Sequence, residues 1–185
     1  MIASYDADAV TAALPMDRCI DLMAEVQVRI SRGEIRLPLR QFVSHGTEAQ
    51  GLLVMPGSLG DGDVFGAKLL SLFPENSAQG RPAIQGSVLL FDPVTGAPMA
   101  LIDAAKLTAL RTAAASGVAT RALAKSEAAT LAILGYGVQA ESHLVAMAKV
   151  RKLREVRVWG PKLERAQAFA AKHDVGVPIH AVRGA

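Results

Sequence analysis

The sequence has little cysteine, few aromatic residues and no long apolar run, and each shortage excludes a class of protein. Cys19 is the only cysteine among 185 residues, so no disulfide can form within the chain, which favours a reducing compartment. The longest apolar stretches, such as 131–134 and 87–91, fall far short of the roughly 20 residues that span a membrane. The N-terminus MIASYDADAV carries acids and no basic segment, unlike a signal peptide. We expect a cytoplasmic protein without a membrane segment.

Motifs for several common chemistries are also lacking. The four histidines have no metal-ligand spacing with one another or with the cysteine, so no metal site is expected. No GxSxG, HExxH or GKS/T motif occurs, which removes the commonest hydrolases and NTPases. A basic cluster over 149–157 raises the alternative of nucleic-acid binding, but it alternates with aliphatic residues, as a solvated helix end does. We expect no nucleic-acid partner.

What is present is a globular composition, 51% hydrophobic and 20% charged, with a mixed pattern in its first part. Apolar residues recur at helical spacing over 15–31, and Gly33 follows as a stop. Short apolar runs at 51–55, 64–73, 84–91 and 98–102 predict strands, the last two joined by a turn at Asp92–Gly96 into an antiparallel hairpin. A helix rich in small residues is predicted over 107–124.

The pattern then alternates strictly between strand and helix. Strands are predicted at 130–134, 155–159 and 177–181, with helices at 138–150 and 162–173 between them. This order is typical of a parallel, doubly wound sheet. A complete dinucleotide domain of this type has about six strands, so three strands suggest that the chain stops halfway through the domain. The expected fold class is therefore α/β, an N-terminal α+β region followed by a truncated Rossmann-type parallel sheet.

The segment Leu131–Ala140, LAILGYGVQA, predicts a dinucleotide-binding turn between the first of these strands and its helix. Unpaired N–H groups and the helix dipole attract a pyrophosphate there. Gly135 suits the tight turn, Gly137 lets a phosphate approach the backbone, and Ala140 lets helix and strand pack closely. The next strand ends in VWGPK (158–162) without an acid and with Lys162 nearby, which favours NADP(H), with NAD(H) as the alternative.

Three cations lie in apolar contexts and suggest an anion site. Lys68 lies in VFGAKLLSLF, where burial would make it a proton donor or the partner of an anionic substrate; alternatively, its stem packs while its head reaches water. Arg111 has small or apolar neighbours on its helix and could bind a carboxylate through its planar fork, or pair with a structural Asp or a helix carbonyl. Arg40 is a third, weaker candidate.

Several segments together resemble the ornithine cyclodeaminase and mu-crystallin family of NAD(P)-dependent enzymes. They are MPG (55–57), GAKLLSLFPEN (66–76), LLFDPVTGAPMALID (89–103), LTALRTAAASGVAT (107–120) and GYGVQA (135–140). The resemblance covers essentially the whole chain, and it rests above all on the LTALRTAA and KLLSLFPEN runs.

The resemblance implies a role for each candidate residue. Arg40 and Arg111 match arginines that hold the substrate carboxylate, and Lys68 matches the catalytic lysine that also contacts this carboxylate. In the family, hydride moves between the nicotinamide and the α-carbon of an amino or imino acid. The implied cofactor contacts are Arg111, Thr112, Gly135, Gly137, Val138 and Gln139. The family's catalytic aspartate is expected beyond Ala185, in an enzyme of roughly 300 residues.

The resemblance thus implies an oxidoreductase of amino acid metabolism that reduces an α-imino acid, a ketimine or pyrroline-2-carboxylate, to the amino acid. One alternative is an ornithine cyclodeaminase that converts L-ornithine to L-proline and ammonia with bound NAD. A second is a mu-crystallin-like ligand-binding protein without turnover. The expected organisation is a substrate-binding and dimerisation domain over 1–120, the first half of an NAD(P)-binding domain over 121–185, and a homodimer.

Overall fold

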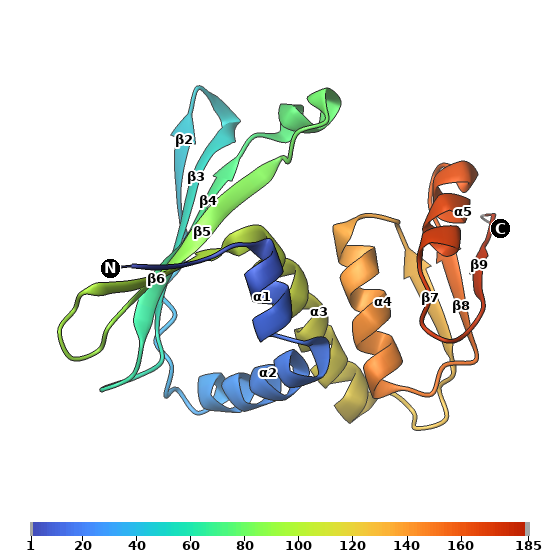
Figure 1. Ribbon diagram of the computed structural model, residues 1–185, viewed down its shortest axis with the longest axis horizontal. Coiled ribbons are helices and arrows are strands. Elements are labelled where there is room, and N and C mark those ends of the chain that lie inside the picture. The colour runs from blue at the N-terminus through green and yellow to red at the C-terminus, as the bar shows by residue number, and fades with distance from the viewer. Residues whose placement is uncertain (1, 184–185) are drawn as a thin grey trace. The chain divides into compact units, whose positions relative to one another are not determined.

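The computed structural model describes residues 2–183, which form two compact units (Figure 1). Among the described residues, the first unit comprises 2–14 and 25–108, and the second comprises 15–24 and 109–183. Two helices, α2 (Met16–Ser31) and α3 (Ala104–Leu123), contribute residues to both units. The domain boundary expected at residue 120 stays a prediction.

The first unit is built on a six-stranded sheet in the order β1-β6-β5-β4-β3-β2. All neighbours in it are antiparallel except β1 and β6, which are parallel. The strands are β1 (Ala3–Tyr5), β2 (Gln41–His45), β3 (Thr47–Ser58), β4 (Phe65–Leu72), β5 (Ile84–Phe91) and β6 (Pro98–Asp103). A helix, α1 (Ala7–Ala13), packs against β1 and β6, and a 3₁₀ turn, η1 (Pro74–Gln79), precedes β5.

The predicted hairpin between β5 and β6 is confirmed, and Asp92 organises its turn. The Asp92 carboxylate accepts hydrogen bonds from the backbone N–H of Thr95 at 2.8 Å and of Val94 at 3.0 Å. These bonds, together with one from the Thr95 hydroxyl, hold the pKa of Asp92 below its ordinary value. Gly96 has a φ of +71°, which favours glycine. The turn thereby sets the register that pairs Leu89 with Leu101.

The second unit contains a three-stranded parallel sheet in the order β7-β8-β9, as the alternating pattern predicts. Its elements are β7 (Thr130–Leu134), α4 (Val138–Val150), β8 (Glu155–Trp159), α5 (Leu163–Lys172) and β9 (Ile179–Ala181). The elements β7, α4 and β8 have the predicted bounds. Val156 and Val158 of β8 are fully buried together with Leu144 of α4, and Phe169 of α5 completes this core. Alternate burial along β8 is what a strand covered on one face by helices requires.

Small residues bring α3 close to its neighbours within the second unit. Ala113 and Ala114 have no exposed surface. A Cβ at Gly117 would lie 3.2 Å from the Ile20 side chain and 3.8 Å from Ala146 of α4. This confirms the predicted small-residue helix. It begins at Ala104, earlier than predicted, because the Asp103 carboxylate accepts the backbone N–H of Lys106 at 2.6 Å and so caps the first turn.

Candidate functional site

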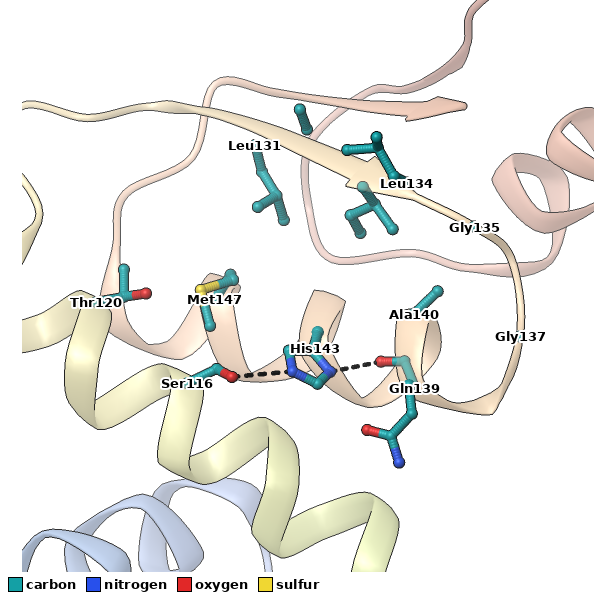
Figure 2. Close-up of a pocket in the computed structure, with 12 residues that line it drawn as sticks. Ser116, Thr120, Leu131, Leu134, Gly135, Gly137, Gln139, Ala140, His143 and Met147 are labelled. Atoms are coloured by element: carbon teal, nitrogen blue, oxygen red, sulfur yellow. Dashed lines mark hydrogen bonds between the residues drawn. The ribbon is translucent and has the colours of Figure 1, made fainter. Parts of the chain in front are cut away.

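The segment between β7 and α4 has the geometry expected of a dinucleotide-binding turn (Figure 2). Gly135 has a φ of +114°, which other residues rarely adopt, and its N–H donates to the Trp159 carbonyl at 2.7 Å. Gly137 is the N-cap of α4 and has no side chain to occupy the first N–H groups of the helix. The first intrahelical bond runs from the Glu141 N–H to the Gly137 oxygen.

The space in front of this turn fits a pyrophosphate. A Cβ placed at Gly135 or Gly137 would meet no atom of residues 2–183 within 4 Å. Val138 is 70% exposed, so the positive end of α4 faces open space, where an anion is stabilised. Ala140 packs against the core beneath β7, as its small size predicts. The contacts assigned to Gly135, Gly137, Val138 and Gln139 stay predictions that this geometry suits.

The end of β8 carries a second feature of a dinucleotide site. Gly160 is buried under the Tyr136 ring, and a Cβ there would overlap that ring. Tyr136 thus requires glycine at the position where NAD-specific folds carry an acid. Two cations, Lys162 and Arg183, line the hollow beside this position together with Trp159. Arg183 is a candidate that sequence reasoning missed, because it follows a strand of only three residues.

Lys68 lies in the centre of β4, on the face that contains the first unit's buried sheet residues. Its cross-strand partners are Met55 and Val88, and its Nζ lies 3.5 Å from the Thr108 hydroxyl oxygen at the start of α3. The side chain is half-buried, which agrees with the alternative of a packed stem and a solvated head. Its stem packs in an apolar row while its ammonium reaches a polar partner, because a charge cannot be left unsolvated there.

The two arginines lie on the surface, in different segments of the chain. Arg40 is exposed in the segment before β2, and Arg111 is exposed on α3. Lys68 and Arg40 belong to the first unit and Arg111 to the second, three residues after Thr108 on the same helix. Thr112, the next residue, is half-buried. The joint role of these cations in holding a carboxylate stays a prediction.

A cleft of about 470 Å³ in the second unit brings together residues of α3, β7 and α4. Figure 2 shows Ser116 of α3 facing His143 of α4 across it, with the Ser116 Oγ to His143 Nε2 distance 3.0 Å. Nδ1 of the same ring lies 2.7 Å from the Gln139 carbonyl oxygen. Gly135 and Gly137 line the same cleft. No signal in the sequence indicates this pair, because Ser116 and His143 lie 27 residues apart.

Comparison with known proteins places the chain in a family. The model of the ornithine cyclodeaminase/mu-crystallin family matches residues 3–185. This chain belongs to that family. Among curated relatives, the Delta(1)-pyrroline-2-carboxylate reductase of Bacillus cereus is 38% identical over 133 residues, which cover 72% of this chain and 41% of the relative. The ketimine reductase mu-crystallin of Mus musculus is 37% identical over 139 residues, covering 75% and 44% respectively.

Solved structures of the ornithine cyclodeaminase/mu-crystallin type share the fold. The Delta(1)-pyrroline-2-carboxylate reductase of Thermococcus litoralis, in complex with NADH and L-proline, superposes with a TM-score of 0.92 and 33% identity. That match covers 100% of this chain and 58% of the neighbour. An archaeal alanine dehydrogenase dimer with bound NAD gives 0.90 and 26%, covering 98% and 56%. The chain thus spans about half the length of the proteins it matches.

Two further observations concern other classes of site. Across residues 2–183, no three His, Cys, Asp or Glu side chains are grouped so that they could hold a metal ion. In the same part of the chain, no helix combines the length and the apolar character needed to cross a bilayer.

Proposed function

We propose that this protein is an NAD(P)H-dependent reductase that converts an α-imino acid, a ketimine or pyrroline-2-carboxylate, to the amino acid. The open turn at Gly135 and Gly137 before α4 carries the proposal, because it provides the backbone N–H groups that a dinucleotide needs. The names of the family relatives support the substrate class. The neighbour with NADH and L-proline holds a reduced cofactor and an amino acid together.

The residues of the chain would divide the work between binding and orientation. The first N–H groups of α4 hold the pyrophosphate, and Arg111 and Thr112 of α3 contact the cofactor. The bound nicotinamide supplies the hydride. Lys68, Arg40 and Arg111 hold the substrate carboxylate, which orients the reacting carbon. Lys68, whose Nζ lies 3.5 Å from the Thr108 hydroxyl oxygen, would also donate the proton that the imine nitrogen needs.

The substitution Gly137→Ala tests the cofactor site directly. Gly137 has a φ of −91°, which alanine adopts freely, and its Cβ would meet no described atom within 4 Å. We expect the melting temperature to stay unchanged while the dinucleotide Kd rises roughly tenfold or more, because the methyl group occupies the phosphate's place. Quenching of Trp159 fluorescence measures the Kd.

Gly135→Ala is the matched comparison for that experiment. At a φ of +114°, alanine costs about 1–3 kcal/mol of backbone strain, so this variant should lose stability as well as affinity. An unchanged Kd in Gly137→Ala would contradict the proposed pyrophosphate site.

We propose NADP(H) as the preferred cofactor. Lys162 and Arg183 line the hollow beside Gly160, where a 2′-phosphate would lie. Replacing either cation with alanine should raise the Kd for NADPH by roughly tenfold and leave that for NADH nearly unchanged, since a hydrogen bond to a charged group is worth about 1.5–3 kcal/mol. Arg154→Ala, an exposed cation just before β8, is the control. Equal losses for the two cofactors would rule out this preference.

The second candidate function is ornithine cyclodeamination, which the family includes by name. The same cations would hold the ornithine carboxylate. Turnover separates the two candidates. Formation of L-proline from L-ornithine without net cofactor consumption would replace the reductase proposal, whereas oxidation of NADPH by pyrroline-2-carboxylate supports it.

We also propose that the protein is a homodimer in the cytoplasm. The single cysteine is buried, and one face of the first unit's sheet is apolar and exposed, as described below. The alanine dehydrogenase neighbour is described as a dimer. The exposed apolar face agrees with a second copy that covers it. The single buried cysteine agrees with a reducing compartment.

A further inference from the structure

We infer that the hydrogen bond between Ser116 and His143 positions the dinucleotide-binding turn against α3. This inference rests on the proposed cofactor site and adds two positioning residues to it. Both residues are half-buried in the cleft that Gly135 and Gly137 also line. Their side chains connect the two helices from which the cofactor contacts are expected (Figure 2).

The bonding of His143 determines the direction of the contact. The Gln139 carbonyl, 2.7 Å from Nδ1, can only accept a hydrogen bond, so Nδ1 carries the ring proton. In the neutral ring, Nε2 is therefore an acceptor, and the Ser116 hydroxyl donates to it over 3.0 Å. Both ring nitrogens are thus used, and the ring is held between the first turns of α4 and the middle of α3.

The position of each partner relates it to the cofactor. Ser116 lies four residues after Thr112 on α3, and His143 lies four residues after Gln139 on α4. Residues four apart lie one above the other on a helix face. One directed bond therefore connects the turn below Thr112 with the turn that presents Gln139, and it sets the spacing between the two segments.

The surrounding contacts explain why a directed bond matters here. Gly117 of α3 faces Ala146 of α4, where an added Cβ would lie 3.8 Å from the Ala146 side chain. Smooth contacts between such small residues resist sliding and rotation weakly. A single polar pair fixes the register of apolar helices in coiled coils. Arg151 joins α3 and α4 at their C-terminal ends, whereas Ser116 and His143 join the helices closer to Thr112 and Gln139.

The experiment compares Ser116→Ala and His143→Phe with the unaltered full-length protein. Each variant removes one partner and keeps the packing volume close to the original. We expect the Kd for NADH and NADPH to rise about three- to tenfold, the range that one lost hydrogen bond produces. The melting temperature and the kcat at saturating cofactor should change little. The double variant should bind as weakly as either single variant, because both disrupt the same contact.

Two further variants make the test specific. His143→Gln keeps an acceptor for the Ser116 hydroxyl and should recover most of the affinity. Ser142→Ala removes a neighbouring hydroxyl that bonds only to Val138 O of its own helix among the bonds the structure shows, and it should leave the Kd unchanged. An unchanged Kd in folded Ser116→Ala and His143→Phe overturns the inference, as does an equal loss in Ser142→Ala. If the unaltered protein binds neither dinucleotide, the proposed function itself fails.

Discussion

Lys68 combines the two alternatives that the sequence left open. One is a lysine buried in an apolar strand, and the other is a lysine whose stem packs while its head reaches a polar environment. Its stem lies in an apolar row with Met55 and Val88, which explains why the surrounding sequence looks like a buried strand. Its ammonium nevertheless reaches the Thr108 hydroxyl, because burying a lone charge costs several kcal/mol. A substrate carboxylate would be a stronger partner than a hydroxyl. The residue is therefore half-buried, which suits its proposed role in binding a carboxylate.

The substitution Lys68→Met separates packing from charge at this position. Methionine fills the row between Met55 and Val88, so the melting temperature should stay the same or rise. The KM for the imino acid should rise roughly tenfold or more and kcat should fall, because a charge-assisted hydrogen bond is lost. Steady-state kinetics with pyrroline-2-carboxylate measure both constants. Lys149→Met, an exposed cation on α4, is the control, and unchanged kinetics in Lys68→Met would exclude Lys68 from the substrate site.

A side chain that follows α4 binds the C-terminal end of α3. Arg151, just after α4, donates from one guanidinium nitrogen to the carbonyls of Thr120 and Ala124, each at 2.6 Å. It also donates to the Lys125 carbonyl at 3.2 Å. These carbonyls lie at the C-terminal end of α3 and just after it, where few intrahelical donors remain. The Thr120 and Lys125 carbonyls also accept the backbone N–H of Ala124 and of Ala128, both at 3.1 Å, so Arg151 adds a second bond to each. The basic cluster over 149–157 thus has a structural role in addition to a solvated face.

Replacing Arg151 with alanine should lower the stability of the protein and leave its affinity for the dinucleotide nearly unchanged. Losing several charge-assisted bonds to carbonyls should lower the free energy of unfolding by about 2 kcal/mol. Urea denaturation measures this loss, with Arg154→Ala as a control because that side chain is exposed. The dinucleotide Kd should change by less than about twofold. A large rise in Kd without loss of stability would contradict the division of roles between Arg151 and His143.

The six-stranded sheet has two unlike faces that together suggest how copies of the protein associate. The pairing register places Lys68 on the same face as the buried Leu70 and Ala100. The opposite face carries Val43, Leu52, Phe65 and Leu101, which are 58%, 42%, 39% and 40% exposed. A contiguous apolar sheet face of this kind is typical of an interaction surface.

The substitution Leu52→Glu should convert the proposed homodimer to a monomer. Leu52 lies on β3, beside the edge strand β2, and pairs with Val43. A carboxylate there cannot be buried against a second copy without several kcal/mol of desolvation cost. Light scattering coupled to size-exclusion chromatography measures the mass in solution. Val94→Glu, at a turn position that is 90% exposed, should leave the mass unchanged. A monomeric unaltered protein, or a Leu52→Glu variant of unchanged mass, would contradict this interface.

Most helices and strands could be predicted from the sequence, because their signals are local. The strand from Thr130 and the helix from Val138 follow from apolar periodicity and from the glycines between them. The elements β1, α1 and β2 were not predicted. Two of them, β1 and α1, have only three and seven residues, too few for a period to show, and β2 is exposed along its whole length. Such strands form because a neighbouring strand offers unpaired N–H and C=O groups, which the sequence does not reveal.

By itself, the sequence determined the order of elements, the glycine turn and the family resemblance, since each depends on residues that are neighbours along the chain. Only the tertiary structure decided which side chains that are distant in the sequence come into contact. It placed Thr108 beside Lys68, 40 residues away, and His143 beside Ser116, 27 residues away. It also set Tyr136 over Gly160 and left one sheet face apolar and exposed. These contacts depend on strand register and helix packing, which are selected by the free energy of the whole fold and have no local pattern.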